Sequence, residues 1–435
     1  MKRVLWFRRD LRIEDNKLLS YDAEVLPIFI FDKNILDKLE PQDRRVSLIY
    51  DSVMDLKGKL KTLGLDLKIF YDTPQSVFEK LLKSYEFDEV VASGDYDTYA
   101  KERDLKISLK LHFRYLNETY LFKPKEILKK DNSPYLLFTP FCKEASKRLQ
   151  TIDLSREKVG DMQLLKADYA SVPSLEEMGF VRQQVALSDP YAELECFKTK
   201  LAEYKQNRDY LAVDATSNLS TALRFGLIGV RTIVRELVGL EGSDEFIRQL
   251  IFREFYAYLL FHFPYLENNN FKYNFNGIAD EEKFARFTTA RTGVPIVDAG
   301  IRELLTSGYM HNRVRMVVAS FLTKDLLLPW RWGESFFAKH LLDYDKASNV
   351  LSWQWSAGTG VDPQPYFRVF NPYLQSKKFD KEGIYIQRYL PELSELPAKC
   401  LHDESYLLQA EISNYPKPIV NHKIAAKQAI EVFKH

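Results

Sequence analysis

The sequence predicts an N-terminal α/β domain of the doubly wound, Rossmann-like kind and an all-α C-terminal domain. Three observations support this fold class. The chain has 435 residues, enough for two to three domains of about 150 residues each. Its first 130 residues alternate short apolar runs with amphipathic stretches, a pattern typical of a parallel sheet wrapped by helices. After residue 196 the strand pattern fades and longer helical stretches take over.

Short β-branched and apolar runs mark the strands expected in the N-terminal part. They are Val4–Phe7, Val25–Phe31, Leu65–Tyr71 and Glu89–Ser93. Between the second and third runs, apolar residues recur at the spacing of a helix that buries one face: Ile49, Val53, Leu56 and Leu60. Strand, helix and strand in this order predict a βαβ unit.

Changes in this pattern set the expected domain limits. We predict an α/β domain over residues 1–130, a connector with weak periodicity over 131–195, and a helical domain over 196–435. Within the helical part, helices are predicted at Asp244–His262, Pro295–Ser307 and His311–Leu328.

Charge and composition exclude several classes of protein. Lys and Arg number 62 against 61 Asp and Glu, a net charge of +1, which excludes a polycation but leaves room for a local basic groove. Hydrophobic residues at 46% and charged residues at 28% are typical of a globular protein and exclude a disordered chain.

The cysteines Cys142, Cys196 and Cys400 lie far apart in the sequence, without a C-x-x-C pair or a His at ligand spacing. This excludes a disulfide framework and a self-contained metal site, and it indicates a reducing compartment. No run of about 18 uncharged apolar residues occurs. We therefore expect a cytoplasmic protein that binds no metal and no membrane.

The sequence lacks the phosphate loops and nucleophile motifs of common enzyme classes. One candidate anion site remains: ATSNLS at 215–220 places three hydroxyls and an amide just before a helical pattern, which suits a phosphate or pyrophosphate. An N-cap turn with spare hydroxyls is the alternative interpretation, and both stay open.

The densest group of candidates is GYMHNRVRM at 308–316, followed by Asp343, Asp345, Asn349, Trp353 and Trp355. Arg313 and Arg315 are two positions apart, so on a helix they point about 200° from each other. One of them can face a ligand while the other pairs with an internal carboxylate such as Asp343. Solvated arginines and core tryptophans are the simpler interpretation of each residue alone.

A third candidate is the helical segment QLIFREFY at 249–256. Gln249, Phe252, Arg253 and Tyr256 fall at i, i+3, i+4 and i+7 and share one helix face. An amide, two rings and a cation on one face suit a planar ligand or an exposed base. An ordinary half-buried helix is the alternative.

In these motifs the sequence resembles the DNA photolyase/cryptochrome family almost from end to end. The matching motifs are FRRDLR at 7–12, DN at 15–16, FTPF at 138–141, TSNLS at 216–220, REFY at 253–256, TGVPIVDAGIREL at 292–304, MHNRVRM at 310–316, WQW at 353–355, YFRVFNP at 366–372 and YPKPIV at 415–420. Within the family, the chain is most similar to class I photolyases for cyclobutane pyrimidine dimers. The resemblance implies an α/β antenna domain and a helical domain that binds FAD and DNA.

The resemblance also implies which residues hold FAD. Around the phosphates and ribitol it places Tyr204, Thr216, Ser217, Asn218, Leu219 and Ser220. Around the isoalloxazine ring it places Arg253, Arg315, Asp343, Asp345 and Asn349. In this arrangement Arg315 pairs with Asp343, and Asn349 faces the reactive ring nitrogen. Asn218 stands where many relatives have Arg.

Trp353 and Trp330 match the inner members of the family's electron-transfer chain to FAD. The outer member falls in NFNGI at 274–278, which holds no Trp, so Tyr273 or another nearby Tyr would take its place. In the antenna domain, Tyr99 and Ala100 replace the Asn-Glu pair with which relatives bind folate. A folate antenna is therefore not expected, whereas a deazaflavin, a second flavin or no antenna stay open.

On the DNA side, the resemblance implies contacts from Gln249, Phe252, Tyr256, Asn312, Arg313, Met316, Trp355 and Gln375. The implied reaction is light-driven: excited reduced FAD donates an electron to a flipped-out dimer, the ring splits and the electron returns. Gln249 and Phe252 replace a Glu and a Trp of dimer-repairing relatives. We expect repair to survive these changes with weaker binding or lower yield.

Two alternatives to a repair enzyme follow from the same residues. A cryptochrome-like blue-light photoreceptor would bind FAD and signal to a protein partner, and Gln249 with Phe252 would mark a lapsed repair site. A protein that binds damaged DNA without repairing it is the other alternative. Because Asn312, Arg313 and Trp355 are all present, we expect an enzyme, a deoxyribodipyrimidine photo-lyase that acts as a monomer.

Overall fold

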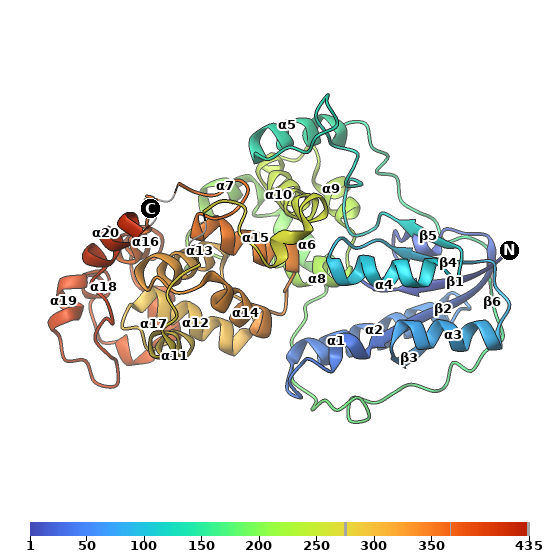
Figure 1. Ribbon diagram of the computed structural model, residues 1–435, viewed down its shortest axis with the longest axis horizontal. Helices are drawn as coiled ribbons and strands as arrows, with labels where there is room; N and C mark the ends of the chain where they lie inside the picture. Colours follow the sequence, from blue (N-terminus) through green and yellow to red (C-terminus); the bar gives the residue numbers. More distant parts are fainter. Residues whose placement is uncertain (274–275, 366, 433–435) are drawn as a thin grey trace. The chain divides into compact units, whose positions relative to one another are not determined.

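The computed structural model describes residues 1–273, 276–365 and 367–432 of the chain. These residues form two compact units (Figure 1). The first unit contains Met1–Tyr135, Thr139–Thr199 and Ser217–Pro264, and the second contains Leu136–Phe138, Lys200–Thr216 and Tyr265–His435. Each unit is described by itself.

The first unit is built on a parallel sheet. Its strands are β1 (Lys2–Phe7), β2 (Ala23–Asp32), β3 (Lys68–Asp72), β4 (Glu89–Ser93), β5 (Phe113–Leu116) and β6 (Met162–Leu164). Five of them follow the order β3-β2-β1-β4-β5, and β6 pairs with the start of β2. All these pairings are parallel. The predicted doubly wound fold class is confirmed.

Helices connect the strands of this sheet (Figure 1). They are α1 (Lys33–Leu36), α2 (Arg44–Thr62), α3 (Pro74–Ser84) and α4 (Thr98–Ser108). The last three begin after Asp43, Thr73 and Asp97, whose side chains each accept a backbone N–H of the first turn. These N-caps satisfy donors that would otherwise have no partner inside the helix.

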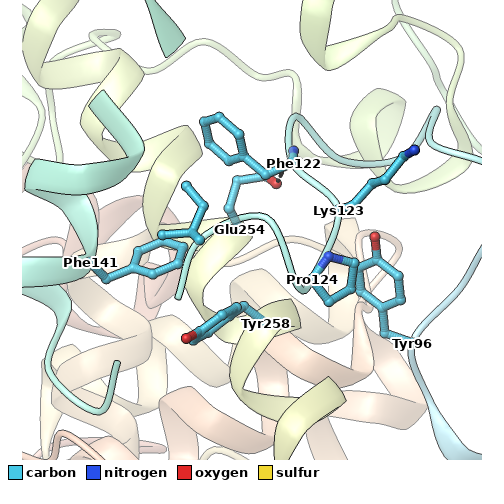
Figure 2. Close-up of a pocket in the computed structure, with 8 residues that line it drawn as sticks. Tyr96, Phe122, Lys123, Pro124, Phe141, Glu254 and Tyr258 are labelled. Carbon is cyan, nitrogen blue, oxygen red and sulfur yellow. Dashed lines mark hydrogen bonds between the residues drawn. The ribbon is translucent and has the colours of Figure 1, made fainter. Parts of the chain in front are cut away.

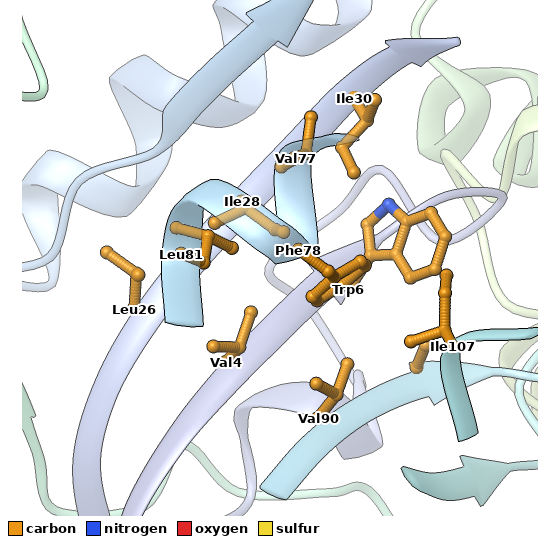
Figure 3. Close-up of a cluster of buried hydrophobic side chains, with 11 residues drawn as sticks. Val4, Trp6, Leu26, Ile28, Ile30, Val77, Phe78, Leu81, Val90 and Ile107 are labelled. Atoms are coloured by element: carbon orange, nitrogen blue, oxygen red, sulfur yellow. The ribbon is translucent and has the colours of Figure 1, made fainter. Parts of the chain in front are cut away.

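Both faces of the sheet are buried. On one face, Val4 and Trp6 of β1 pack with Phe78 of α3 (Figure 3), and the Trp6 and Phe78 rings meet edge to face at 5.1 Å between centroids. The alternate residues Leu5 and Phe7 are fully buried as well. Burial on two faces explains why the strands form continuous apolar runs. All four predicted strands are present, although β3 begins at Lys68 rather than Leu65.

The sequence analysis missed β5 and β6. Arg114 and Tyr115 of β5 are exposed, and β6 has only three residues, so neither strand forms an apolar run. Because β6 lies inside the predicted connector, that segment contributes a strand to the sheet instead of only linking two domains. The predicted domain limits at residues 130 and 195 stay a prediction.

Five further helices belong mainly to the first unit: α5 (Phe138–Leu149), α6 (Pro190–Lys198), α8 (Ser220–Phe225), α9 (Val230–Leu237) and α10 (Ser243–His262). The loop after β1 packs against the end of α8, where Leu11 N donates to Phe225 O at 3.2 Å. Gly226 follows with a φ of 67°, and a Cβ there would lie 2.0 Å from Arg9 O. Only glycine fits this contact.

The second unit is built of helices. They are α7 (Tyr204–Asn207), α11 (Glu281–Thr288), α12 (Pro295–Ser307), α13 (Asn312–Ser320), α14 (Trp330–His340), α15 (Lys346–Ala357), α16 (Pro372–Phe379), α17 (Ile384–Tyr389), α18 (Ala398–Leu401), α19 (Glu404–Gln409) and α20 (His422–Val432). Short 3-10 helices lie at Lys17–Leu19, Leu201–Glu203, Pro264–Glu267 and Pro391–Leu393. The predicted helix His311–Leu328 is present from Asn312 to Asp325, where α13 continues directly into a π-helical segment over Phe321–Asp325.

Two glycines allow helices of this unit to pack closely. A Cβ at Gly300 of α12 would lie 2.4 Å from Val314 Cγ1 of α13. A Cβ at Gly333 of α14 would lie 2.1 Å from the Trp353 ring of α15. Both helix pairs therefore depend on the missing side chain.

None of the described helices is long and apolar enough to cross a membrane. The same residues contain no group of three or more His, Cys, Asp and Glu side chains that could hold a metal ion.

Candidate functional site

Arg315 and Asp343 form a largely buried ion pair in the second unit. Arg315 donates from Nη2 to Asp343 Oδ2 at 2.9 Å and from Nε to Met310 O at 2.6 Å. Burial opposes the charge of Arg315, but the Asp343 carboxylate raises its pKa. The other oxygen, Asp343 Oδ1, is buried and has no hydrogen-bond partner among the described residues. The predicted pair is present, with one carboxylate oxygen left for another donor.

Tyr309 links this pair to Thr216. The two side chains share a hydrogen bond, and Arg315 Cζ lies 5.3 Å from the centre of the Tyr309 ring. Burial raises the pKa of Tyr309 to about 12, so its phenol is neutral near pH 7. Another predicted FAD residue of this unit, Tyr204, is buried with Arg208 Cζ 5.3 Å from its ring centre. The sequence analysis included Tyr309 in the candidate segment 308–316 but gave it no role of its own.

Asp345 and Asn349 lie at the start of α15. Asp345 is the N-cap and accepts from Ser348 N at 3.1 Å. Asn349 is buried and donates from Nδ2 to Glu334 O at 3.1 Å and to Glu334 Oε1 at 2.9 Å. Because the amide nitrogen already donates inside the protein, the predicted role of Asn349 toward a flavin falls to its carbonyl oxygen or requires the amide to turn.

The two predicted electron-transfer tryptophans are buried in the second unit. Trp353 meets Phe337 edge to face at 4.9 Å between ring centroids. Trp330 donates from Nε1 to Asn270 Oδ1 at 2.8 Å. The outer segment was predicted at 274–278, and residues 274–275 lie outside the described part of the chain. Tyr273, the predicted substitute, is 47% exposed, so it is accessible to a reductant in solution.

The N-terminal turn of α13 carries Asn312, Arg313 and Met316. Asn312 is exposed, and its Nδ2 lies 3.9 Å from Met316 Sδ. Arg313 donates from Nη2 to Asp209 Oδ2 at 2.6 Å, and its Cζ lies 4.4 Å from the Phe379 ring centre. As predicted from their spacing, Arg313 and Arg315 meet different partners. The sequence analysis missed Asp209, because no short-range pattern connects it to Arg313.

Trp355 and Gln375, the other predicted DNA contacts of this unit, are half-buried. The Trp355 ring meets Phe370 at 6.5 Å between centroids. Gln375 Oε1 is buried without a hydrogen-bond partner in the described part of the chain. Trp355 therefore has exposed ring surface, and Gln375 has a free acceptor oxygen, that a ligand could contact.

The segment 217–220 lies in the first unit, before α8. Asn218 adopts the left-handed region with a φ of 54°, and Ser217 Oγ accepts from Leu219 N at 3.4 Å. Leu219 is the N-cap, and the structure gives α8 no side-chain cap in the described residues. The N-cap alternative for these hydroxyls stays open, and the roles of Ser217 and Ser220 toward FAD stay a prediction.

The four residues predicted to share one face of α10 have two different sets of contacts. Phe252 and Tyr256 meet with ring centroids 5.9 Å apart, and Gln249 Nε2 donates to Glu245 Oε1 at 2.7 Å. Arg253 instead donates from Nη1 to Thr119 O at 2.8 Å. All four of these residues are half-buried. Arg253 Nη2 is buried and has no hydrogen-bond partner among residues 1–273, 276–365 and 367–432.

A small pocket in the first unit holds a residue that the sequence analysis missed. Glu254 lies among Phe122, Phe141 and Tyr258 (Figure 2). Burial raises the pKa of Glu254 to about 7. In the sequence, Glu254 is only an acidic residue between Arg253 and Phe255. The REFY motif does not indicate that the side chains of Arg253 and Glu254 have different surroundings.

In the antenna region, Tyr99 donates its hydroxyl to Asp32, which also caps α1. Asn34 Nδ2 lies 3.2 Å from the same hydroxyl. Tyr99 is therefore bound to other side chains of the first unit, and the expectation of no folate antenna stays a prediction.

The two parts of the chain match two family models. Residues 3–159 match DNA photolyase, and residues 246–435 match the FAD binding domain of DNA photolyase. The chain belongs to the DNA photolyase family. The predicted family, the photolyase type of enzyme and the FAD cofactor are thereby confirmed.

Named relatives agree with the family models. The chain is 34% identical to the deoxyribodipyrimidine photo-lyase of Alkalihalophilus pseudofirmus, with 99% of this chain and 98% of the relative covered. It is 30% identical to that of Escherichia coli, again with 99% and 98% covered.

Solved structures resemble the chain over its whole length. A bacterial class III photolyase from Agrobacterium tumefaciens has a TM-score of 0.87 at 31% identity, covering 100% of this chain and 97% of its own. An archaeal photolyase from Sulfolobus tokodaii, described with two FAD molecules, has a TM-score of 0.87 at 30% identity with both chains fully covered. A Synechocystis cryptochrome at 24% identity also reaches 0.87, with 99% of each chain covered, which supports the fold alone.

The side chains of the second unit fit FAD as the photolyase cofactor. Asp343 Oδ1 is a buried acceptor without a hydrogen-bond partner in the described chain, and Arg315 Nη2 lies 2.9 Å from the other oxygen of the same carboxylate. A buried anionic acceptor beside a fixed guanidinium suits the polar edge of a flavin, whose ring carries both donors and acceptors.

Proposed function

We propose that this photolyase repairs cyclobutane pyrimidine dimers in DNA under blue or near-UV light. One observation carries the proposal: the Arg315–Asp343 pair with its open oxygen lies in a chain that matches deoxyribodipyrimidine photo-lyases over 99% of its length. When bound in its reduced form, FAD supplies one electron to the dimer after excitation and regains it once the two cyclobutane carbon–carbon bonds have broken, without net oxidation or reduction.

Residues of the second unit would hold the flavin. Asp343 Oδ1 would accept a hydrogen bond from the cofactor, and Arg315 holds the carboxylate in place through its other oxygen. Asn349, Trp353 and Trp330 on the helices α14 and α15 are buried and would exclude water from the cofactor. We assign electron transfer during cofactor reduction to the two tryptophans.

Other side chains would receive the damaged DNA. Exposed Asn312 with Met316 on α13 offers an amide beside an apolar surface, which suits the edge and face of a flipped-out base. Arg313 suits a phosphate contact. Phe252 and Tyr256 on α10 present a pair of rings on which a dimer can stack, with Gln249 as a hydrogen-bonding neighbour.

The test is repair of a thymine-dimer oligonucleotide by the purified, dithionite-reduced protein under blue or near-UV light. A dark sample and a (6-4) photoproduct oligonucleotide are run beside it. We expect light-dependent loss of the cyclobutane dimer alone. No repair by fully reduced, FAD-loaded protein would reject the proposal and favour a photoreceptor, for which Gln249 and Phe252 are the motivating substitutions.

Three finer assignments belong to this proposal. We propose that the enzyme is a class I photolyase, although one solved relative is named a class III photolyase. The antenna is left open between a deazaflavin, a second flavin and none, and the two FAD molecules of the archaeal relative support testing a second flavin first. A cytoplasmic location, which three cysteines without a disulfide support, and a monomeric state complete the proposal.

A further inference from the structure

A short turn over residues 308–311 connects α12 to α13 and helps to hold Arg315. The Met310 carbonyl of this turn accepts from Arg315 Nε at 2.6 Å, and Arg315 Nη2 donates to Asp343 Oδ2 at 2.9 Å. The guanidinium therefore has two acceptors, one on the turn and one on the segment between α14 and α15. Because a guanidinium is a rigid planar fork, the place of Met310 O determines how Arg315 meets Asp343.

The other side of the same peptide group is held by Glu303 of α12. The peptide group that joins Met310 to His311 presents its C=O to Arg315 and its N–H to Glu303 Oε2, with His311 N at 3.1 Å. It lies in the interior, since Met310 is fully buried and Glu303 and His311 are 6% and 8% exposed. One peptide group thus stands between a carboxylate and a guanidinium and is bonded to both.

This arrangement strengthens both hydrogen bonds. A carboxylate at the N–H polarises the peptide group, so its oxygen becomes a better acceptor, and the effect is larger where water is excluded. Burial lowers the pKa of Arg315, but attraction by Asp343 and, more weakly, by Glu303 raises it overall. Glu303 therefore acts on Arg315 both through the peptide group and through its own charge.

The same turn also holds the segment that carries Asp343. Leu342, the residue before Asp343, donates from its backbone N to Gly308 O at 2.8 Å. Gly308 has a φ of 74°, and a Cβ there would lie 2.6 Å from Leu342 Cγ, so glycine allows this close approach. Both members of the Arg315–Asp343 pair are therefore fixed to the turn that Glu303 anchors.

Two tyrosines of α17 share the Glu303 carboxylate with the turn. The Tyr385 hydroxyl donates to Oε2 at 2.6 Å, and the Tyr389 hydroxyl donates to Oε1 at 3.3 Å. Burial raises the pKa of both phenols, that of Tyr389 to about 12, so both are neutral donors near pH 7. Glu303 thus also links α12 to α17, and this purely structural role has to be separated from an effect on Arg315.

We propose that Glu303 is a positioning residue for Arg315, which it holds against Asp343 through the peptide group of Met310 and His311. The Glu303 carboxylate is occupied by its three donors, so it acts through Arg315 and not by contact with FAD. The consequence for FAD binding rests on the proposed function, in which Asp343 Oδ1 accepts from the cofactor. The consequence for the Arg315 side chain does not depend on that function.

The first measurement is the Arg315 Nε–H signal in NMR spectra of the full chain labelled with ¹⁵N-arginine, recorded at pH 8 without FAD and with saturating FAD. The variant Arg315→Lys identifies this signal in the FAD-free chain. Glu303→Gln keeps an acceptor oxygen for His311 N but removes the charge. Met310 O then becomes a weaker acceptor, and the Arg315 Nε–H proton should move upfield.

The second measurement is the FAD dissociation constant, determined by flavin fluorescence, with urea unfolding of the same variants beside it. We expect Glu303→Gln to bind FAD about fivefold more weakly than wild type, the size of a modest coupling between two groups.

Glu392→Gln is the matched control. Glu392 Oε2 accepts from Nη1 of Arg302, the residue before Glu303 on α12, at 2.9 Å. The variant therefore removes a neighbouring carboxylate that has no bond to the turn 308–311 among the described residues. It should lower the free energy of unfolding but keep the wild-type FAD affinity and the wild-type Arg315 signal.

Two results would overturn the proposal. One is an Arg315 Nε–H signal that Glu303→Gln leaves in place. The other is an equal loss of FAD affinity in Glu303→Gln and Glu392→Gln, since the loss would then follow stability alone. A moved signal with wild-type FAD affinity would support the positioning of Arg315 and contradict the assignment of Asp343 Oδ1 to FAD in the proposed function.

If Glu303→Gln does not fold, Tyr385→Phe decides. This variant removes the second donor from Glu303 Oε2 and leaves the charge, so the bond from His311 N becomes stronger. The Arg315 Nε–H proton should then move downfield, opposite to its shift in Glu303→Gln. An unmoved signal in Tyr385→Phe would overturn the proposal.

Discussion

Two arginines predicted to face FAD, one in each unit, each lie beside a buried carboxylate, but at different distances. Arg315 donates to Asp343 at 2.9 Å, whereas Arg253 lies 3.9 Å from Glu254. In the close pair, attraction overcomes burial and raises the pKa of Arg315. In the loose pair, burial dominates and raises the pKa of Glu254 to about 7. Attraction therefore outweighs burial for Arg315 in the close pair, whereas burial outweighs attraction for Glu254 in the loose pair.

Breaking the close pair should have the largest effect. Arg315→Met leaves Asp343 buried without its cation, which typically costs about 3–5 kcal/mol of unfolding free energy. We expect the variant to lose bound FAD and to unfold at lower urea concentration, measured by flavin absorbance and circular dichroism. The double variant Arg315→Met with Asp343→Leu should recover much of the stability but no FAD. A single variant as stable as wild type would show that the pair contributes little.

Removing the Glu254 carboxylate, by contrast, should raise the free energy of unfolding above pH 7. Since the folded pKa of Glu254 is about 7 against an ordinary value of 4.5, the folded protein binds this proton more tightly than the unfolded chain. The contribution is therefore fully present below pH 4.5 and is lost as pH rises through 7, by up to about 3 kcal/mol. Glu254→Gln should lack this fall and be the more stable protein at pH 8.

Urea unfolding at pH 5, 6, 7 and 8 measures how the free energy of unfolding changes with pH. Glu126 provides the contrast, because its contacts with the Lys123 amide and Arg148 outweigh burial and lower its pKa. Glu126→Gln should therefore be less stable than wild type by a constant amount from pH 5 to 8, because the stability that Glu126 contributes is fully present above pH 4.5 and is lost only below it. The same slope in wild type and Glu254→Gln would contradict the assignment.

The Arg313–Asp209 ion pair is more exposed to solvent than the two pairs compared above. Its side chains are 18% and 29% exposed, so Asp209→Asn should cost only about 0.5–1 kcal/mol of unfolding free energy. The change frees the Arg313 guanidinium for a phosphate. We expect dimer-containing DNA to bind more tightly, with a salt dependence steeper by about one unit, whereas Arg313→Gln, which removes the guanidinium, should lack this increase. Equal slopes in both variants would exclude a phosphate contact.

Adding a carboxylate to the exposed side of α10 should have the smallest effect on stability. In Gln249→Glu, the new charge stands four residues after Glu245 in place of the present hydrogen bond, a cost of about 0.3–0.5 kcal/mol. Combined with Phe252→Trp, which enlarges the stacking surface, it should raise the quantum yield of repair or the affinity for a thymine dimer. Unchanged or lower values of both would show that this enzyme positions its dimer differently.

Long periodic elements could be predicted from the sequence. Helix α12 matches the predicted range Pro295–Ser307, and α10 begins one residue before the predicted start at Asp244. Their apolar spacing and terminal signals are local properties of the chain. By contrast, β6 is a strand because three residues pair with β2 across more than a hundred residues of sequence, and no local pattern carries that information.

The candidate site divides in the same way. Arg313 and Arg315 could be assigned to different surfaces from their spacing alone, and Asp343 was a predicted partner of Arg315. Asp209, Tyr309 and Glu254 could not be predicted, because each acts through a contact that the fold makes.

The sequence by itself determined the order of elements, the two kinds of architecture and the residue types that suit a flavin and a damaged base, since these depend on periodicity and side-chain chemistry. Only the tertiary structure decided which charges are paired, how closely, and how deeply they are buried. Those three quantities set the electrostatic energy of each group, and they depend on backbone segments that meet only after folding. Arg253 and Glu254 are neighbours in the sequence, yet the loop 119–124 decides what each of them binds.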